Sequence, residues 1–135
     1  MKLTPWVFIS GAVLCFLAVL IGAFGAHALQ AQLVENDKLT TFDTASQYHF
    51  FHAFALLLVS IIDMPKALLS TQRFVSLCFI VGVCIFSGSL YLLSITNIAF
   101  LGVLTPVGGV VLLMAWVGMM RIGFKWNFVN KLPNH

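Results

Sequence analysis

The sequence predicts an all-α polytopic membrane protein, folded as a compact bundle of four transmembrane helices. Hydrophobic residues make up 61% of the 135-residue chain and charged residues only 8%, whereas about 25% of the residues in an ordinary globular chain are charged. The apolar residues also gather into four runs, each close to the ~20 residues that a helix needs to cross a bilayer. Little sequence remains outside these runs, so residues 1–135 are expected to form a single membrane domain.

The four apolar runs set the expected spans at residues 5–26, 45–62, 74–95 and 98–120. The first run is too long for a signal peptide, whose hydrophobic region has about 7–15 residues. Within it, Ala18, Gly22 and Ala26 recur every four residues. Small residues at this spacing let a second helix approach closely, so we expect this face to pack inside the bundle, with Gly22 as a close contact.

The segment after the first span is predicted to be an extramembrane loop over residues 27–44. Leu29, Leu33 and Val34 give this loop one apolar side, which favours a short helix at the membrane interface. The remainder of the loop is polar, and its charged residues are Glu35, Asp37, Lys38 and Asp43.

The later boundaries are marked by turn-forming residues. Residues 63–66 contain Pro65 and end the second span, and a tight turn at Thr96–Asn97 joins the third span to the fourth. In the fourth span, Pro106 is expected to kink the helix and interrupt it, because proline removes a backbone donor. Beyond residue 120, the segment 121–135 is expected to leave the membrane as a basic cytoplasmic tail.

The distribution of basic residues predicts that both termini are cytoplasmic, because cytoplasmic segments carry an excess of lysine and arginine. In the four-span arrangement, six basic residues lie on the cytoplasmic side and one on the other. An arrangement of three spans, in which residues 42–62 only dip into the membrane, gives the same count. The four-span arrangement is preferred because it places every polar motif in one leaflet. The net charge of +3 is thus a matter of topology, and nucleic acid is not an expected partner. On the side of the termini lie Lys2, Lys66, Arg73, Arg121, Lys125 and Lys131, against Lys38 alone on the other.

Polar residues within the spans predict where a functional centre lies, because an unpaired polar group is costly in a bilayer. We expect His52 to hydrogen-bond to a hydroxyl group of the third or fourth span, His27 to lie at the rim, and His49 to be partly hydrated. The residues expected to form this polar cluster are His27, Gln47, His52, Ser87, Ser89, Tyr91 and Thr105.

Two roles are open for the histidines. They hydrogen-bond across the bundle and fix its register, or His27, His49 and His52 form a metal or haem site with Asp43 nearby, since imidazole binds zinc, copper, iron and nickel. We expect no cofactor and assign no catalytic residue, because the motifs of the common hydrolases are absent. The leading expectation is a structural or accessory membrane subunit, in contact with the bilayer and with a membrane protein or a second copy. A small transporter or channel component, working as an oligomer, is the other alternative.

Several motifs together resemble those of the YgdD-like small inner-membrane proteins, a family defined by a domain of unknown function. The resemblance implies a four-span protein of the bacterial inner membrane and gives no activity. It also implies that His27 and His52 are the family's histidines, whereas His49 and Phe51 stand where a glutamine-like residue and a tyrosine are expected. The matching stretches are Gly22–His27, Phe42 with Thr44–Ala45 and Gln47–Tyr48, His52–Ala53, Ser87–Tyr91 and Thr105–Gly109.

Overall fold

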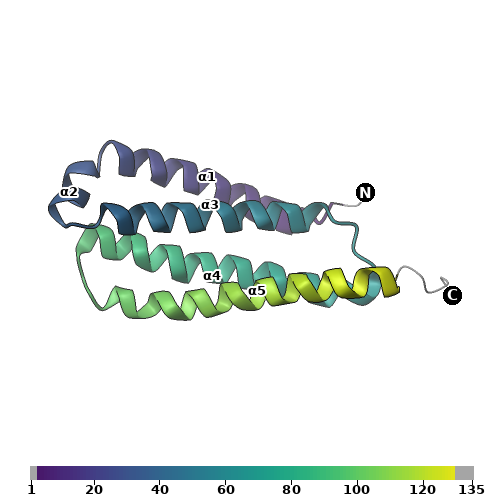
Figure 1. The fold of residues 1–135 in the computed structure, drawn as a ribbon. Coiled ribbons are helices and arrows are strands. Elements are labelled where there is room, and N and C mark those ends of the chain that lie inside the picture. Colours follow the sequence, from purple (N-terminus) through teal and green to yellow (C-terminus); the bar gives the residue numbers. More distant parts are fainter. Residues whose placement is uncertain (1–2, 130–135) are drawn as a thin grey trace.

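The computed structural model describes residues 3–129, which form helices and no β-strand. The all-α class is therefore confirmed. Successive long helices run antiparallel, so the start of α1 and the end of α5 lie at the same end of the molecule (Figure 1). The elements are α1 (Pro5–Ala26), α2 (Gln30–Glu35), α3 (Leu39–Ile61), the 3₁₀ turn η1 (Lys66–Leu68), α4 (Leu69–Thr96) and α5 (Leu101–Val129).

Three helical segments within residues 3–129 are long and apolar enough to cross a membrane, namely Pro5–Ala26, Lys66–Thr96 and Leu101–Trp126. Helix α3 is not one of them, so composition does not confirm the fourth span expected at residues 45–62. The first span has the predicted bounds, whereas α3 begins earlier, at Leu39, and α4 with η1 begins at Lys66 rather than at residue 74.

The structure shows helical segments in the predicted tail and loop. Residues 121–129 continue α5, and residues 130–135 lie outside the described part, so the cytoplasmic position of the basic tail stays a prediction. The expected short helix in the 27–44 loop is confirmed as α2, whose Leu33 is fully buried. The end of that predicted loop already belongs to α3. The predicted turn after Thr96 is also confirmed, and Asn97 adopts the left-handed conformation (φ 55°) that asparagine tolerates.

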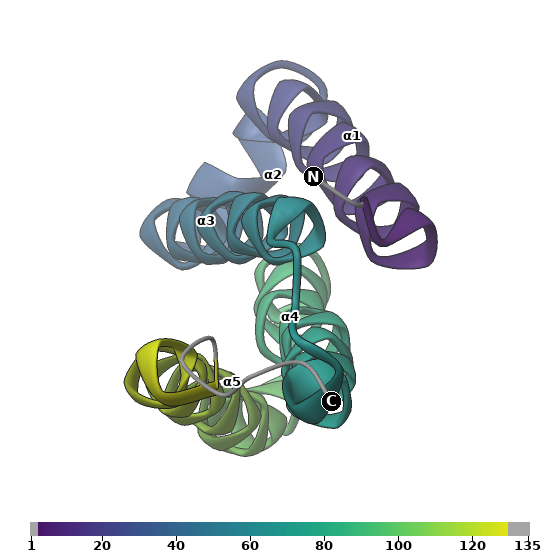
Figure 2. The ribbon, with the colours of Figure 1, turned by 90° about the vertical axis from the view of Figure 1, so that its right-hand side faces the viewer.

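The four long helices form an open row. Helix α1 packs on α3, α3 on α4, and α4 on α5, and the end-on view shows α1 and α5 at opposite ends of this row (Figure 2). Helix α4 is therefore the most enclosed candidate span: 44% of its most apolar stretch is buried, against 17% for α1 and 22% for α5. Among residues 3–129, the outer faces of α1 and α5 have no neighbouring helix.

The contact face of α1 differs from the predicted one. Its buried residues are Val7, Gly11, Ala18 and Gly25. Gly11, Ala18 and Gly25 recur every seven residues, and of the predicted Ala18, Gly22 and Ala26 only Ala18 is among them. A Cβ at Gly25 would overlap the Phe42 ring of α3, whereas a Cβ at Gly22 would meet nothing within 4 Å. The prediction that Gly22 makes the close contact is therefore wrong, and Ala26 is exposed as well.

Helices α4 and α5 pack tightly through glycines. A Cβ at Gly108 would overlap the backbone of Phe86, and one at Gly82 would lie 2.8 Å from Leu112 Cγ. Helix α5 continues through Pro106, so the predicted interruption does not occur.

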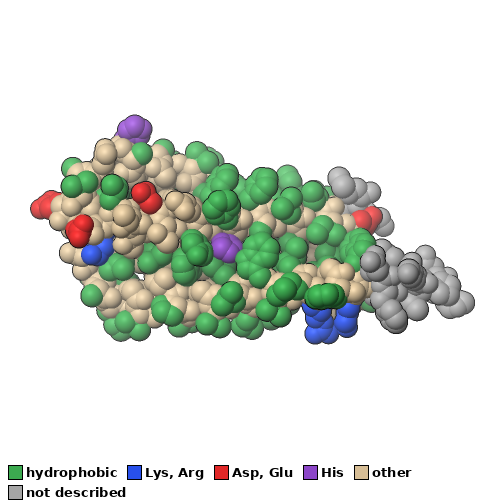
Figure 3. All heavy atoms as spheres, viewed as in Figure 1, with side chains coloured by type: hydrophobic (Ala, Val, Ile, Leu, Met, Phe, Trp, Pro, Cys, Tyr) green, Lys and Arg blue, Asp and Glu red, His purple; other side chains and the backbone are tan. Residues whose placement is uncertain are grey.

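The surface has the polarity of a membrane protein. On the face drawn in Figure 3, charged side chains occur towards the two ends of the molecule and hydrophobic side chains cover the middle. Large hydrophobic residues are widely exposed, including Phe16 (66%) and Phe51 (67%). Such an apolar girdle is stable in lipid and unfavourable in water.

Candidate functional site

The first candidate site is a cleft between α3 and α5 with α4 as its floor, which we call the His52 cleft. It has a volume of about 400 Å³ and is lined by side chains that include Tyr48, His52, Phe86, Pro106 and Trp116. Aromatic rings surround the imidazole: the Tyr48 ring centroid lies 5.7 Å from that of His52 in a stacked arrangement, and the Trp116 ring lies edge-on at 6.0 Å. Helical spacing explains the stack, since Tyr48 and His52 are one turn apart on α3.

Both ring nitrogens of His52 have partners. Nδ1 lies 2.7 Å from the Tyr48 backbone oxygen, and Trp116 Nε1 donates to His52 Nε2 over 3.2 Å. An indole N–H only donates and a carbonyl only accepts, so the geometry assigns the neutral tautomer with its proton on Nδ1. The Trp116 bond joins α3 directly to α5. Apart from this bond, α4 lies between the two helices and packs on both.

The second candidate site is a buried polar group between α3 and α4, which we call the His49 cluster: Ser46, His49 and Tyr91. The Tyr91 hydroxyl lies 3.3 Å from Ser46 Oγ and 3.4 Å from His49 Nδ1. Only 4% of the His49 surface is exposed, and Nε2 has no hydrogen-bond partner in the described structure. The expectation that His49 is partly hydrated is therefore wrong.

The predicted polar cluster divides into separate contacts. Ser89 and Thr105 share a 2.8 Å hydrogen bond between α4 and α5, and Tyr91 belongs to the His49 cluster. Ser87 is buried with no hydrogen-bond partner for its Oγ among the described residues. His27 and Gln47 are exposed.

The proposed partners of His52 are also corrected. His52 is buried and hydrogen-bonded, as expected, but its side-chain partner is Trp116 and not Ser87, Ser89, Tyr91 or Thr105. The reason is helical phase: His52 lies on the side of α3 that faces α5, and His49, three residues earlier, faces α4.

The three candidate metal ligands do not converge. His49 faces Tyr91, His52 faces Trp116, and His27 is exposed. Within residues 3–129, no group of three or more His, Cys, Asp or Glu side chains is close enough to hold a metal ion. The lone pair of His52 Nε2 already accepts the Trp116 proton, so this ring would have to lose that bond to act as a ligand or a base.

Sequence reasoning missed Trp116 and Gln72. A tryptophan in an apolar helix needs an acceptor for its N–H, and this requirement was the available signal for Trp116. Gln72 is 2% exposed, and its Nε2 donates to the Val59 carbonyl oxygen (3.0 Å) and to Thr4 Oγ1 (3.3 Å). It joins α3, α4 and the start of α1 at one end of the molecule. The sequence did not indicate this role, because Gln72 lies between the expected second and third spans, in the connecting residues 63–73.

The antiparallel helices, the apolar girdle and the internal polar contacts define a small multi-pass α-helical membrane protein. A family model described as "Protein of unknown function (DUF423)" matches residues 21–109. The chain belongs to this family, and the relatives it resembles are named UPF0382 membrane proteins.

The relatives are similar to the chain over most of its length. UPF0382 membrane protein YwdK of Bacillus subtilis is 36% identical over 87% of this chain and 95% of its own length. A UPF0382 membrane protein of Staphylococcus aureus is 35% identical over 87% of this chain and 94% of its own, and one of Haemophilus influenzae is 33% identical over 82% and 86%. No solved structure matches the chain. The resemblance to a family of small membrane proteins of unknown function is thus confirmed, and the relatives' names give neither a span count nor the YgdD-like name.

Proposed function

We propose that this protein is a structural or accessory subunit of the bacterial inner membrane, built as a single four-span domain whose outer helices bind a membrane protein partner or a second copy. The observation that carries this proposal is that polar residues inside the bundle form hydrogen bonds between helices. His52, Gln72, Ser89, Thr105 and Tyr91 each make a hydrogen bond from one helix to another. Such bonds fix the helix register and contribute on the order of 0.6–2 kcal/mol each.

The fourth span is supported by how α3 lies between its neighbours. At one end, the Thr4 N–H at the start of α1 donates to the Ser60 carbonyl oxygen of α3, and at the other end Gly25 packs on Phe42. Helix α3 therefore runs alongside the whole of α1, and its 23 residues extend about 34 Å. Because α1 is long and apolar enough to span, an antiparallel neighbour of nearly the same length, packed along it, would cross the same thickness.

The orientation with both termini in the cytoplasm is supported by the fold and the charges together. In the four-span arrangement, the start of α1, the η1 turn and the end of α5 share one side, where Lys66, Arg73, Arg121 and Lys125 are exposed. Helix α2 and the Asn97 turn share the other side with Lys38. The positive-inside rule places the first side in the cytoplasm.

A partner is supported by the open row of helices. Helices α1 and α5 each use one face for packing and leave the opposite face covered with large apolar side chains, such as Phe16 on α1 (66% exposed) and Val103 on α5 (64% exposed). Lipid can cover these faces, and so can the helices of another membrane protein.

Photo-crosslinking in membranes distinguishes lipid from a protein partner on these faces. A photoreactive phenylalanine analogue replaces Phe16, Phe51 or Val103, one exposed position on each of α1, α3 and α5, and the full-length protein is purified after illumination. We expect a discrete protein adduct from at least one position and lipid adducts from the others. Lipid adducts alone at all three positions would contradict the accessory role.

A further inference from the structure

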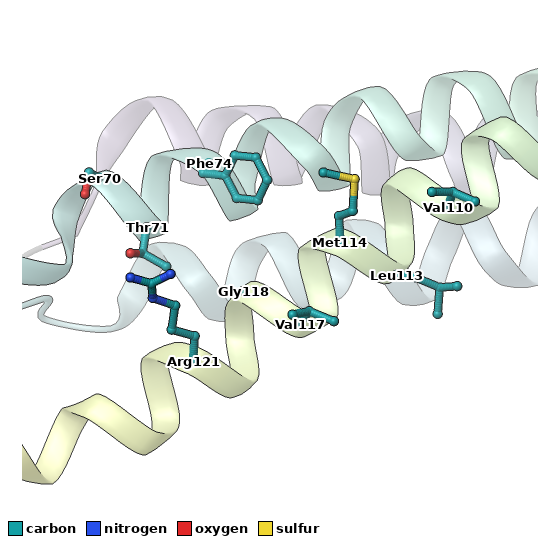
Figure 4. Close-up of a pocket in the computed structure, with 9 residues that line it drawn as sticks. All are labelled: Ser70, Thr71, Phe74, Val110, Leu113, Met114, Val117, Gly118 and Arg121. Carbon is teal, nitrogen blue, oxygen red and sulfur yellow. The ribbon is translucent and has the colours of Figure 1, made fainter.

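A second groove lies between α4 and α5, apart from the His52 cleft, and we call it the Arg121 groove. It has a volume of about 540 Å³, and its lining includes Ser70, Thr71, Phe74, Met114, Val117 and Arg121. Its long wall is apolar and open to the surroundings, since Phe74 is 46% exposed and Val117 60% exposed. The polar members all lie at one end (Figure 4).

The groove has the length of one lipid leaflet. On α5 its lining extends from Val110 to Arg121, which is about 16 Å at 1.5 Å per residue, and half of a ~30 Å hydrocarbon core is about 15 Å. Arg121 also lies 20 residues after Leu101, the start of α5, or about 30 Å along the helix. Arg121 is thus at the level of the lipid headgroups when α5 spans the membrane.

The polar end of the groove is suited to a phosphate. The Arg121 side chain extends from α5 towards Thr71 of α4 in Figure 4, and neither residue forms an ion pair or a side-chain hydrogen bond within residues 3–129. Lys125 lies one helical turn further along the same face of α5. A guanidinium binds phosphate oxygens in bidentate fashion, and hydroxyl groups donate to the same oxygens.

We propose that the Arg121 groove binds an anionic phospholipid of the surrounding leaflet, with one acyl chain along Phe74, Met114 and Val117 and the phosphate at Arg121 and Thr71. Charge complementarity and the match in length identify the occupant. The proposal requires only that α4 and α5 cross the membrane, so it stands independently of the accessory role and of the span count.

Native mass spectrometry of the full-length protein in detergent tests the proposal. The purified protein is titrated with phosphatidylglycerol or with phosphatidylcholine, and bound lipid is counted. Arg121→Gln removes the charge in the groove. Arg73→Gln is the matched control, since Arg73 is an exposed arginine at the same end of α4 that does not line the groove. Val117→Phe fills the groove from an exposed position.

We expect the wild type and Arg73→Gln to bind phosphatidylglycerol about fivefold more tightly than phosphatidylcholine, and Arg121→Gln to lose this preference. Val117→Phe should weaken the binding of both lipids. Size-exclusion profiles and circular dichroism check that each variant is folded. The proposal is overturned if the wild type shows no preference, if both arginine variants lose it equally, or if Val117→Phe instead dissociates a dimer that occupies the groove.

Discussion

The hydrogen bond between Trp116 and His52 joins two helices that are not neighbours in the row. It joins α3 to α5 over the top of α4, and it requires a neutral imidazole, because a doubly protonated ring has no lone pair for the indole N–H. The same contact occupies the nitrogen that a metal or a substrate proton would need. This geometry agrees with the proposal that His52 fixes helix positions.

Replacing Trp116 by phenylalanine should lower the free energy of unfolding by about 1 kcal/mol, because His52 Nε2 loses its donor while most of the aromatic contact remains. Thermal unfolding in detergent measures the effect. Trp6→Phe is the matched control, since Trp6 is similarly exposed (40%, against 43% for Trp116) and does not contact His52. Equal losses in the two variants would show that the N–H bond contributes nothing.

Two adjacent glycines in α5 are expected to respond in opposite ways to alanine. A Cβ at Gly108 would overlap the Phe86 backbone, whereas one at Gly109 would lie 3.7 Å from the Phe86 ring, an ordinary contact distance. Gly108→Ala should therefore destabilise the α4–α5 pair by about 1–3 kcal/mol, and Gly109→Ala should be neutral or stabilising. Thermal unfolding of the two variants in detergent measures this difference. Similar unfolding temperatures would contradict the close packing at Gly108.

Helix α2 is held to the end of α4 by side-chain amides. Asn36 Nδ2 donates to the carbonyl oxygens of Ser94 (3.0 Å) and Ile95 (3.1 Å), and Gln32 Nε2 donates to that of Ile95 (2.8 Å). The last carbonyls of a helix have no partner within it, so these amides stabilise the α4 terminus. They also hold a six-residue helix that is too short to be stable alone.

Asn36→Ala should loosen this attachment and lower the free energy of unfolding by about 1–2 kcal/mol. Amide hydrogen exchange should become faster in α2 and in the last turn of α4, while exchange in the middle of α4 should not change. Gln30→Ala is the control, because Gln30 is an exposed amide of the same helix that does not contact α4 in the described hydrogen bonds. Unchanged protection of α2 in Asn36→Ala would mean that its apolar contacts, including the buried Leu33, hold it in place.

The antiparallel order of the helices places α2 and the Asn97 turn at the same end of the molecule (Figure 1). With four spans, single cysteines introduced between residues 27 and 38 or at the Asn97 turn should react with a membrane-impermeant thiol reagent in intact cells, and one at Met64 should react only after lysis. The native cysteines, Cys15, Cys78 and Cys84, all lie within helices, and the variant lacking them is the control. Protection of the 27–38 segment together with an external amino terminus would support three spans.

The sequence by itself determined the features that depend on composition and on local conformation. These are the helical membrane class, the bounds of α1, the short helix α2, the turn at Asn97 and the burial of His52. Each follows from rules that involve neighbouring residues only: apolar length for a span, and a residue tolerant of the left-handed conformation for a turn. The span expected at residues 45–62 stays a prediction, because the polar residues of α3 lower its apolar character. Of these residues, His49, His52 and Ser60 are buried against neighbouring helices, whereas Gln47 is exposed.

Tertiary structure alone decided which face of each helix makes contacts and which polar groups meet. In a soluble helix, the apolar stripe marks the packed face, but in a membrane helix lipid and protein are almost equally apolar, so the packed face leaves little trace in the sequence. That is why Gly25 rather than Gly22 meets α3, and why Trp116 rather than a serine pairs with His52. The Arg121 groove exists for the same reason: only the approach of α4 to α5 brings Thr71 and Arg121 together from positions fifty residues apart.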